Sequence, residues 1–119
     1  MNWLAIGLLC CGLSVVAGAF GAHGLKTRLD PGALDLWETA ARYLMYGGLG
    51  LSVLGLASHV TARPLGAAAV SLLAGALIFC LTVGALALGG PRWLGAVTPI
   101  GGLLMVLGFF LFALAAWRG

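Results

Sequence analysis

The sequence predicts an all-α integral membrane protein, a single domain covering residues 1–119 that folds as a bundle of four transmembrane helices. Of its 119 residues, 62% are hydrophobic and only 8% are charged, whereas soluble domains are about a quarter charged. The charged side chains leave four uncharged stretches: 1–22, 43–62, 64–91 and 93–117. Each stretch matches the roughly 20 residues that a helix needs to cross a hydrocarbon core about 30 Å thick. A soluble bundle would need polar outer faces, and these segments are apolar all round.

The first helix is expected at about residues 2–22. Ser14, Gly18 and Ala22 recur in it at four-residue spacing, and such a row of small residues lets two membrane helices pack closely. A cleavable signal peptide is the competing interpretation. No lysine or arginine precedes Lys26, so the basic region of a signal peptide is missing. We therefore interpret this segment as a transmembrane helix.

The second helix is predicted to begin with Asp30 as its N-cap and Pro31 at its first position. Residues 31–42 then form an amphipathic lead-in that lies in the membrane interface. Its apolar face carries Leu34, Trp37, Ala41 and Leu44, and its polar face carries Asp35, Glu38 and Arg42. Glu38 precedes Arg42 by four residues, which is the favourable order for an ion pair along a helix.

The transmembrane part of this second helix is expected at 40–60. A helix from residue 30 to residue 60 is about 45 Å long at 1.5 Å per residue, which exceeds the hydrocarbon thickness. It must therefore protrude, tilt or bend, and Gly47 and Gly48 mark the expected bend and a site of close packing.

The third helix is predicted at 65–88, after Arg63 and Pro64, and the fourth at 99–117. In the third, Ala67, Ser71 and Gly75 form another row of small residues. The fourth is expected to start with Thr98 as N-cap and Pro99 at its first position, leaving residues 89–98 as an interfacial connection. Gly101 and Gly102 are its expected packing residues.

Four crossings place both termini on one side of the membrane. The first and third connections hold Lys26, Arg28, Arg42 and Arg92, and the opposite side holds Arg63 and Arg118. The excess of basic residues favours a cytoplasmic location for the first and third connections. We therefore expect a multi-pass protein of the cytoplasmic membrane with non-cytoplasmic termini.

The residues that suggest chemistry gather near the end of the first helix. Contacts with a ligand or with lipid are expected at His23, Lys26, Arg28, Trp37, Glu38 and Arg42. Histidine is the usual switch residue near neutral pH. The plainer interpretations are a helix-end histidine bonded to the backbone, a self-paired polar helix face, and basic residues that meet lipid phosphates. In the expected topology no charge lies at mid-bilayer.

Neither catalysis nor a bound metal or cofactor is expected. Cys10, Cys11 and Cys80 lack metal-binding spacing, and a standard metal site requires three or four ligands. No phosphate-binding loop, Ser/His/Asp set or HExxH motif is present. The excess of three positive charges includes no basic cluster, so nucleic acid is not an expected partner.

Three segments carry a family resemblance: "GAFGAHGLK" at 18–26, "WETAARYLMY" at 37–46 and "TPIGG" at 98–102. They resemble the DUF423 family of small bacterial inner-membrane proteins, which is related to the transmembrane protein 256 group. The resemblance covers about residues 12–112. It implies a small multispanning membrane protein and supplies no catalytic residues. The chain departs from the family pattern at Gly47, where a histidine is common, and at residues 79–82, where the family has an "FSGS"-like segment.

The expected function is that of a non-catalytic structural or accessory subunit. Its partners are membrane lipids and either further copies of itself or a larger membrane complex. The alternative is a lipid-binding or small-molecule-binding or transport protein with a pocket at the His23 end of the bundle.

Overall fold

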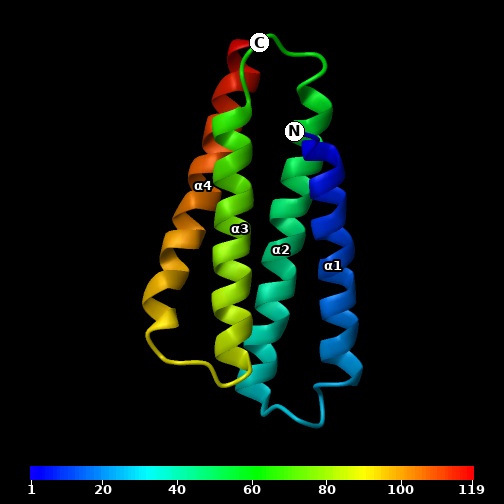
Figure 1. The fold of residues 1–119 in the computed structure, drawn as a ribbon, viewed down its shortest axis with the longest axis vertical. Helices are drawn as coiled ribbons and strands as arrows, with labels where there is room; N and C mark the ends of the chain where they lie inside the picture. Colours follow the sequence, from blue (N-terminus) through cyan, green and yellow to red (C-terminus); the bar gives the residue numbers. More distant parts are fainter.

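A computed structural model describes residues 1–119 as four antiparallel helices, and it contains no strand (Figure 1). The helices are α1 (Trp3–His23), α2 (Pro31–Ala57), α3 (Gly66–Ala87) and α4 (Leu94–Arg118). Each helix packs mainly on its neighbour in the chain, in the order α1, α2, α3, α4, and α2 touches α4 only slightly. The molecule is elongated, with extents of 49 × 27 × 20 Å.

The two ends of the molecule carry different connections (Figure 1). Residues 24–30 and 88–93 join the helices at one end, which we call the His23 end. Residues 58–65 and the two chain termini lie toward the other end, which we call the Arg118 end.

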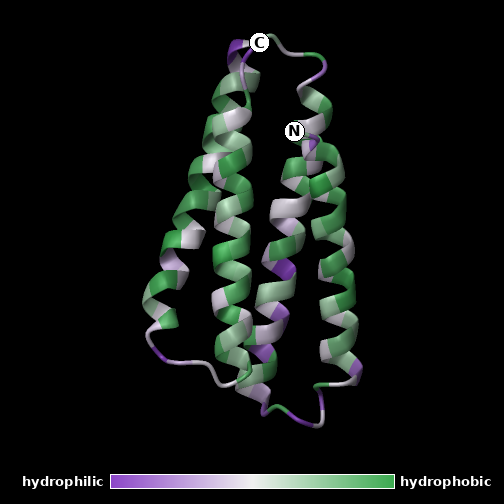
Figure 2. Cartoon of the chain, viewed as in Figure 1, coloured by the Kyte–Doolittle hydropathy of each residue, from purple (hydrophilic) through white to green (hydrophobic).

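Three of the four helices are long and apolar enough to cross a membrane, namely α1, α3 and α4. The expectation that the chain holds four such helices is wrong by this criterion. Helix α2 falls short because charged residues occupy its first half and glycine recurs in its second half. Figure 2 shows this difference, since strongly hydrophilic colour interrupts α2 well inside its length.

Helix α2 is one unbroken helix of 27 residues. Asp30 caps it by accepting a hydrogen bond from the Ala33 N–H at 2.8 Å, with Pro31 at the first position. The amphipathic segment 31–42 is therefore not a separate interfacial helix. The glycine pair does not interrupt α2. Instead, each glycine allows a neighbouring helix to come close. A Cβ at Gly47 would lie 2.5 Å from the Ala76 Cβ, and a Cβ at Gly48 would lie 2.9 Å from the Cys11 Sγ.

Small residues pack α1 against α2 at seven-residue rather than four-residue spacing. Gly7, Ser14 and Gly21 are buried, whereas Ala22 is exposed and a Cβ at Gly18 would meet nothing within 4 Å. A seven-residue repeat keeps one face toward a partner that crosses at about 20°. Of the expected row Ser14, Gly18 and Ala22, only Ser14 packs against another helix of the same chain.

The core lies between α2 and α3, where Leu51, Leu54 and Leu72 are completely buried. Burying a leucine side chain contributes about 1.5–3 kcal/mol relative to exposure in water. In a membrane the same positions gain chiefly from van der Waals contact, because lipid tails are as apolar as leucine.

Helices α3 and α4 also meet through small residues. A Cβ at Gly75 would lie 2.6 Å from the Met105 amide nitrogen and 2.7 Å from the Gly101 carbonyl oxygen. The Ser71 hydroxyl donates to the Leu104 carbonyl at 2.6 Å. Two expected packing residues do not pack in this way: Ala67 is exposed, and at Gly102 a Cβ would touch only the Phe79 ring, at 3.9 Å.

Helix α4 begins at Leu94, so the expected start at residue 99 is wrong. Thr98 does not cap the helix. Its hydroxyl donates to the Leu94 carbonyl at 3.1 Å and lies 2.7 Å from the Thr82 hydroxyl. Pro99 lies inside α4, where its missing N–H leaves the Gly95 carbonyl without its helical partner. In Figure 1 the beginning of α4 lies farther from α3 than the middle of α4 does.

Candidate functional site

The first half of α2 runs antiparallel to the second half of α1, and three contacts fix the register. The Trp37 Nε1–H donates to the Ala17 carbonyl at 2.8 Å, and the Ser14 hydroxyl donates to the Ala41 carbonyl at 2.5 Å. Farther along, a Cβ at Gly7 would lie 2.6 Å from the Gly48 carbonyl oxygen. The polar part of α2 therefore lies beside a helix that is apolar enough to cross a membrane.

This register places Arg42 near the middle of α1. Arg42 follows Ala41, which is level with Ser14, and Ser14 lies about 14 Å from the His23 end of α1 at 1.5 Å per residue. The whole of α1 is about 31 Å long by the same measure. Glu38 lies one helical turn closer to the His23 end. Arg42 therefore lies beside the middle of an apolar helix that is long enough to cross a membrane.

The charged residues of α2 lie on an exposed surface. Asp35, Glu38 and Arg42 are all exposed, and none forms a side-chain hydrogen bond to another residue. The only hydrogen bond between two side chains in the structure joins Thr82 to Thr98. The expected Glu38–Arg42 ion pair is therefore not formed within the chain.

The same surface of α2 continues as an apolar groove. Tyr46, Leu49 and Val53 are each about half exposed at helical spacing from Arg42. Together with Gly50 and with Phe109 and Phe112 of α4 they line a groove of about 490 Å³. We define the open face of α2 by six residues: Asp35, Glu38, Arg42, Tyr46, Leu49 and Val53. It is charged toward the His23 end and apolar toward the Arg118 end.

The remaining predicted site residues form no pocket. His23, Lys26 and Arg28 are exposed at the His23 end, and none of the four cavities in the structure is lined by any of the predicted site residues. Trp37 is half buried and serves packing, because its ring fills the space beside Gly21. No cavity in the structure is lined by His23, so the pocket that the alternative function requires is not formed within the chain.

No metal-binding arrangement is present, since no group of three or more His, Cys, Asp or Glu side chains comes together. The three cysteines are free thiols. Sequence reasoning identified the charges of the open face but missed its groove. The available signal was the helical spacing of Tyr46, Leu49 and Val53, which continues the line of Arg42.

Three membrane-length apolar helices and large apolar side chains exposed along them define a small helical integral membrane protein. Residues 17–102 match the family described as "Protein of unknown function (DUF423)". The chain belongs to this family, as its sequence segments predicted.

Curated relatives of the chain are also named as membrane proteins. The chain is 40% identical over 116 residues to a UPF0382 membrane protein of Staphylococcus haemolyticus, covering 98% of this chain and 95% of the relative. It is 41% identical to a UPF0382 membrane protein of Staphylococcus epidermidis, with the same coverage. A relative from Staphylococcus saprophyticus is 36% identical, with 98% of this chain and 97% of the relative covered. No solved structure matches the chain.

Proposed function

We propose that the protein is a non-catalytic accessory subunit of the cytoplasmic membrane, crosses it four times, and pairs with a second copy through the open face of α2. The observation that carries this proposal is the exposed position of Arg42 beside the middle of α1, with exposed Glu38 one helical turn nearer the His23 end.

Crossing by α2 is supported by its place between two apolar helices. It runs alongside both α1 and α3, and the small and polar residues of its second half, such as Gly47, Gly48 and Ser52, are buried. The residues that this half exposes are mainly large and apolar, including Leu49, Val53 and Leu56. Its low mean hydropathy thus arises partly from residues that lipid does not touch.

An exposed charge at this depth needs a partner. A charged side chain at the centre of a bilayer costs about 2.5–3.5 kcal/mol on insertion scales, and such residues usually pair or face water. A second copy related by a two-fold axis along the membrane normal keeps every residue at its own depth, so Arg42 of each chain reaches one helical turn along the interface to Glu38 of the other. Because a two-fold interface is self-complementary, one arrangement satisfies both arginines and both glutamates.

The apolar half of the open face suits the same partner. The groove between α2 and α4 is walled by Phe109 and Phe112 on one side and by the half-exposed Tyr46, Leu49 and Val53 on the other. Covering this groove adds close van der Waals contact, which drives association between helices in lipid.

Cross-linking in native membranes tests the pairing. The background replaces the three native cysteines with alanine, and a single cysteine is introduced by Val53→Cys in the groove. Leu9→Cys is the matched control, because Leu9 is similarly exposed but lies on α1. A short thiol-reactive linker is expected to join two copies carrying Val53→Cys and to leave Leu9→Cys monomeric.

Charge exchange tests the pairing of Glu38 with Arg42. Arg42→Glu alone sets four carboxylates together and is expected to weaken association at least about tenfold, because an unpaired desolvated charge costs several kcal/mol. The double variant Glu38→Arg, Arg42→Glu restores opposite charges and should recover the cross-linked dimer. Equal cross-linking at Leu9, or no recovery in the double variant, contradicts the proposal.

A further inference from the structure

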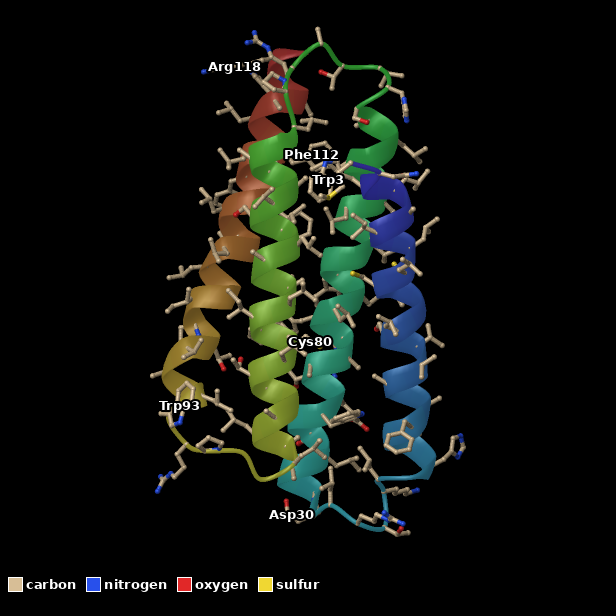
Figure 3. The ribbon with its side chains drawn as sticks, viewed as in Figure 1. Trp3, Asp30, Cys80, Trp93, Phe112 and Arg118 are labelled. Atoms are coloured by element: carbon tan, nitrogen blue, oxygen red, sulfur yellow. The ribbon has the colours of Figure 1, made fainter.

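At the Arg118 end, two arginines flank an apolar groove. Arg63 and Pro64, from the connection between α2 and α3, line it together with four residues of α4: Leu111, Leu114, Ala115 and Arg118. Its volume is about 190 Å³. Both arginines are exposed, as Figure 3 shows for Arg118 at the tip of α4.

The charged side chains at this end are all basic. Asp30, Asp35 and Glu38 are the only acidic side chains of the protein, and all three lie at or before the midpoint of α2, toward the His23 end. Neither arginine therefore has an aspartate or glutamate to neutralise it. A free guanidinium presents five N–H donors in a planar fork that matches a phosphate group.

The start of α3 adds further donors beside Arg63. No side chain caps this helix, so the N–H groups of its first turn lack a side-chain acceptor. Gly66, the first residue, has open space where a Cβ would stand, which leaves the backbone accessible. The positive end of the helix dipole favours an anion at the same place. Arg63 stands three residues before Gly66, and its backbone N–H donates to the Thr61 hydroxyl at 3.2 Å.

The wall of the groove below the arginines is apolar. Leu111, Leu114 and Ala115 follow the surface of α4 into the depth that lipid tails occupy, with Leu114 47% exposed. An anionic head at the arginines and a hydrocarbon chain along α4 together match an amphiphile at a membrane surface.

We propose that the groove lined by Arg63 and Arg118 binds one phospholipid with a net negative headgroup. Its phosphate is held by the two guanidinium groups, near the N-terminus of α3, and one acyl chain lies along Leu111, Leu114 and Ala115. The site lies apart from the open face of α2 and does not depend on pairing of two copies.

Native mass spectrometry of the full-length protein in detergent tests this site with phosphatidylglycerol as the probe. Phosphatidylcholine with the same acyl chains and inorganic phosphate are the comparison ligands. The double variant Arg63→Gln, Arg118→Gln removes the site's charges, and Lys26→Gln, Arg28→Gln removes the same charge at the opposite end. Because all four side chains are exposed, both variants keep the fold, which circular dichroism verifies.

We expect phosphatidylglycerol to remain bound to the unmodified protein and to the Lys26, Arg28 variant, and to bind about tenfold more weakly to the Arg63, Arg118 variant. Ala115→Phe, which fills the groove while both arginines remain, should also reduce binding. Equal retention of phosphatidylcholine, stabilisation by inorganic phosphate alone, or unchanged binding in the arginine variant overturns the proposal. Cross-linking through Val53→Cys is expected to persist in the arginine variant, so the two proposals fail separately.

Discussion

Gly75 illustrates how single atoms determine the distance between helices in this protein. Its missing side chain lets the backbones of α3 and α4 come into direct contact at Met105 and Gly101. Gly18 has the same chemistry and no neighbour within reach of a Cβ. A substitution at Gly75 therefore tests helix packing, whereas the same substitution at Gly18 tests only the effect of glycine on helix formation.

Gly75→Ala is expected to destabilise the protein by about 1–3 kcal/mol, because the new methyl group forces apart a packed interface. Gly18→Ala should be neutral or stabilising by up to about 1 kcal/mol, since alanine is the better helix former. Thermal unfolding of both variants in the same detergent measures the difference. Equal stability of the two variants would show that the α3–α4 contact is looser than the structure shows.

The packing residues show what the sequence alone does not decide. Small residues are frequent in every helix, and rows at four-residue and seven-residue spacing coexist in α1. Only the partner helix selects Gly7 and Gly21 over Gly18 and Ala22. The open face shows the same limit. The charges of Glu38 and Arg42 are plain in the sequence, but their depth follows from the register of α2 against α1.

At the scale of elements, the same local pattern gives two outcomes. A polar residue followed by proline starts α2 at Asp30 and Pro31, yet Thr98 and Pro99 lie inside α4. The two prolines differ because α4 already begins at Leu94, five residues before Pro99. The Thr98 hydroxyl therefore donates to the Leu94 carbonyl within the helix instead of capping its start. The part of α4 before Pro99 contributes no buried residue, whereas Gly101, Met105 and Gly108 after it are buried.

Pro99→Ala is expected to straighten α4, because alanine restores the N–H that bonds the Gly95 carbonyl. Removing a proline bend of about 20° would displace the residues before Pro99 by about 3 Å. Spin labels at Trp93 and Leu81, both well exposed, report the change by pulsed electron paramagnetic resonance.

Pro91→Ala, in the connection before α4, is the control and should leave that label distance unchanged. If Pro99→Ala also leaves the distance unchanged, the divergence of α4 has a cause other than the proline.

For the whole molecule, the antiparallel order of the helices predicts which connections share a side of the membrane. Cysteines introduced by Thr27→Cys and Arg92→Cys lie at the His23 end, and one introduced by Thr61→Cys lies at the opposite end. In the proposed topology, a membrane-impermeant maleimide added to intact cells labels Thr61→Cys and spares the other two. Labelling of Thr27→Cys together with Thr61→Cys would mean that α2 does not cross.

The mid-depth charges of α2 also bear on how the chain enters the bilayer. A segment that carries Glu38 and Arg42 and is less apolar than its neighbours partitions poorly by itself. In the proposed topology its transfer from the translocation machinery therefore depends on α1 and α3, which shelter its glycines and serines. In that topology we expect α2 to enter the bilayer together with α1 or α3 as a helical hairpin or triplet, rather than as a single segment.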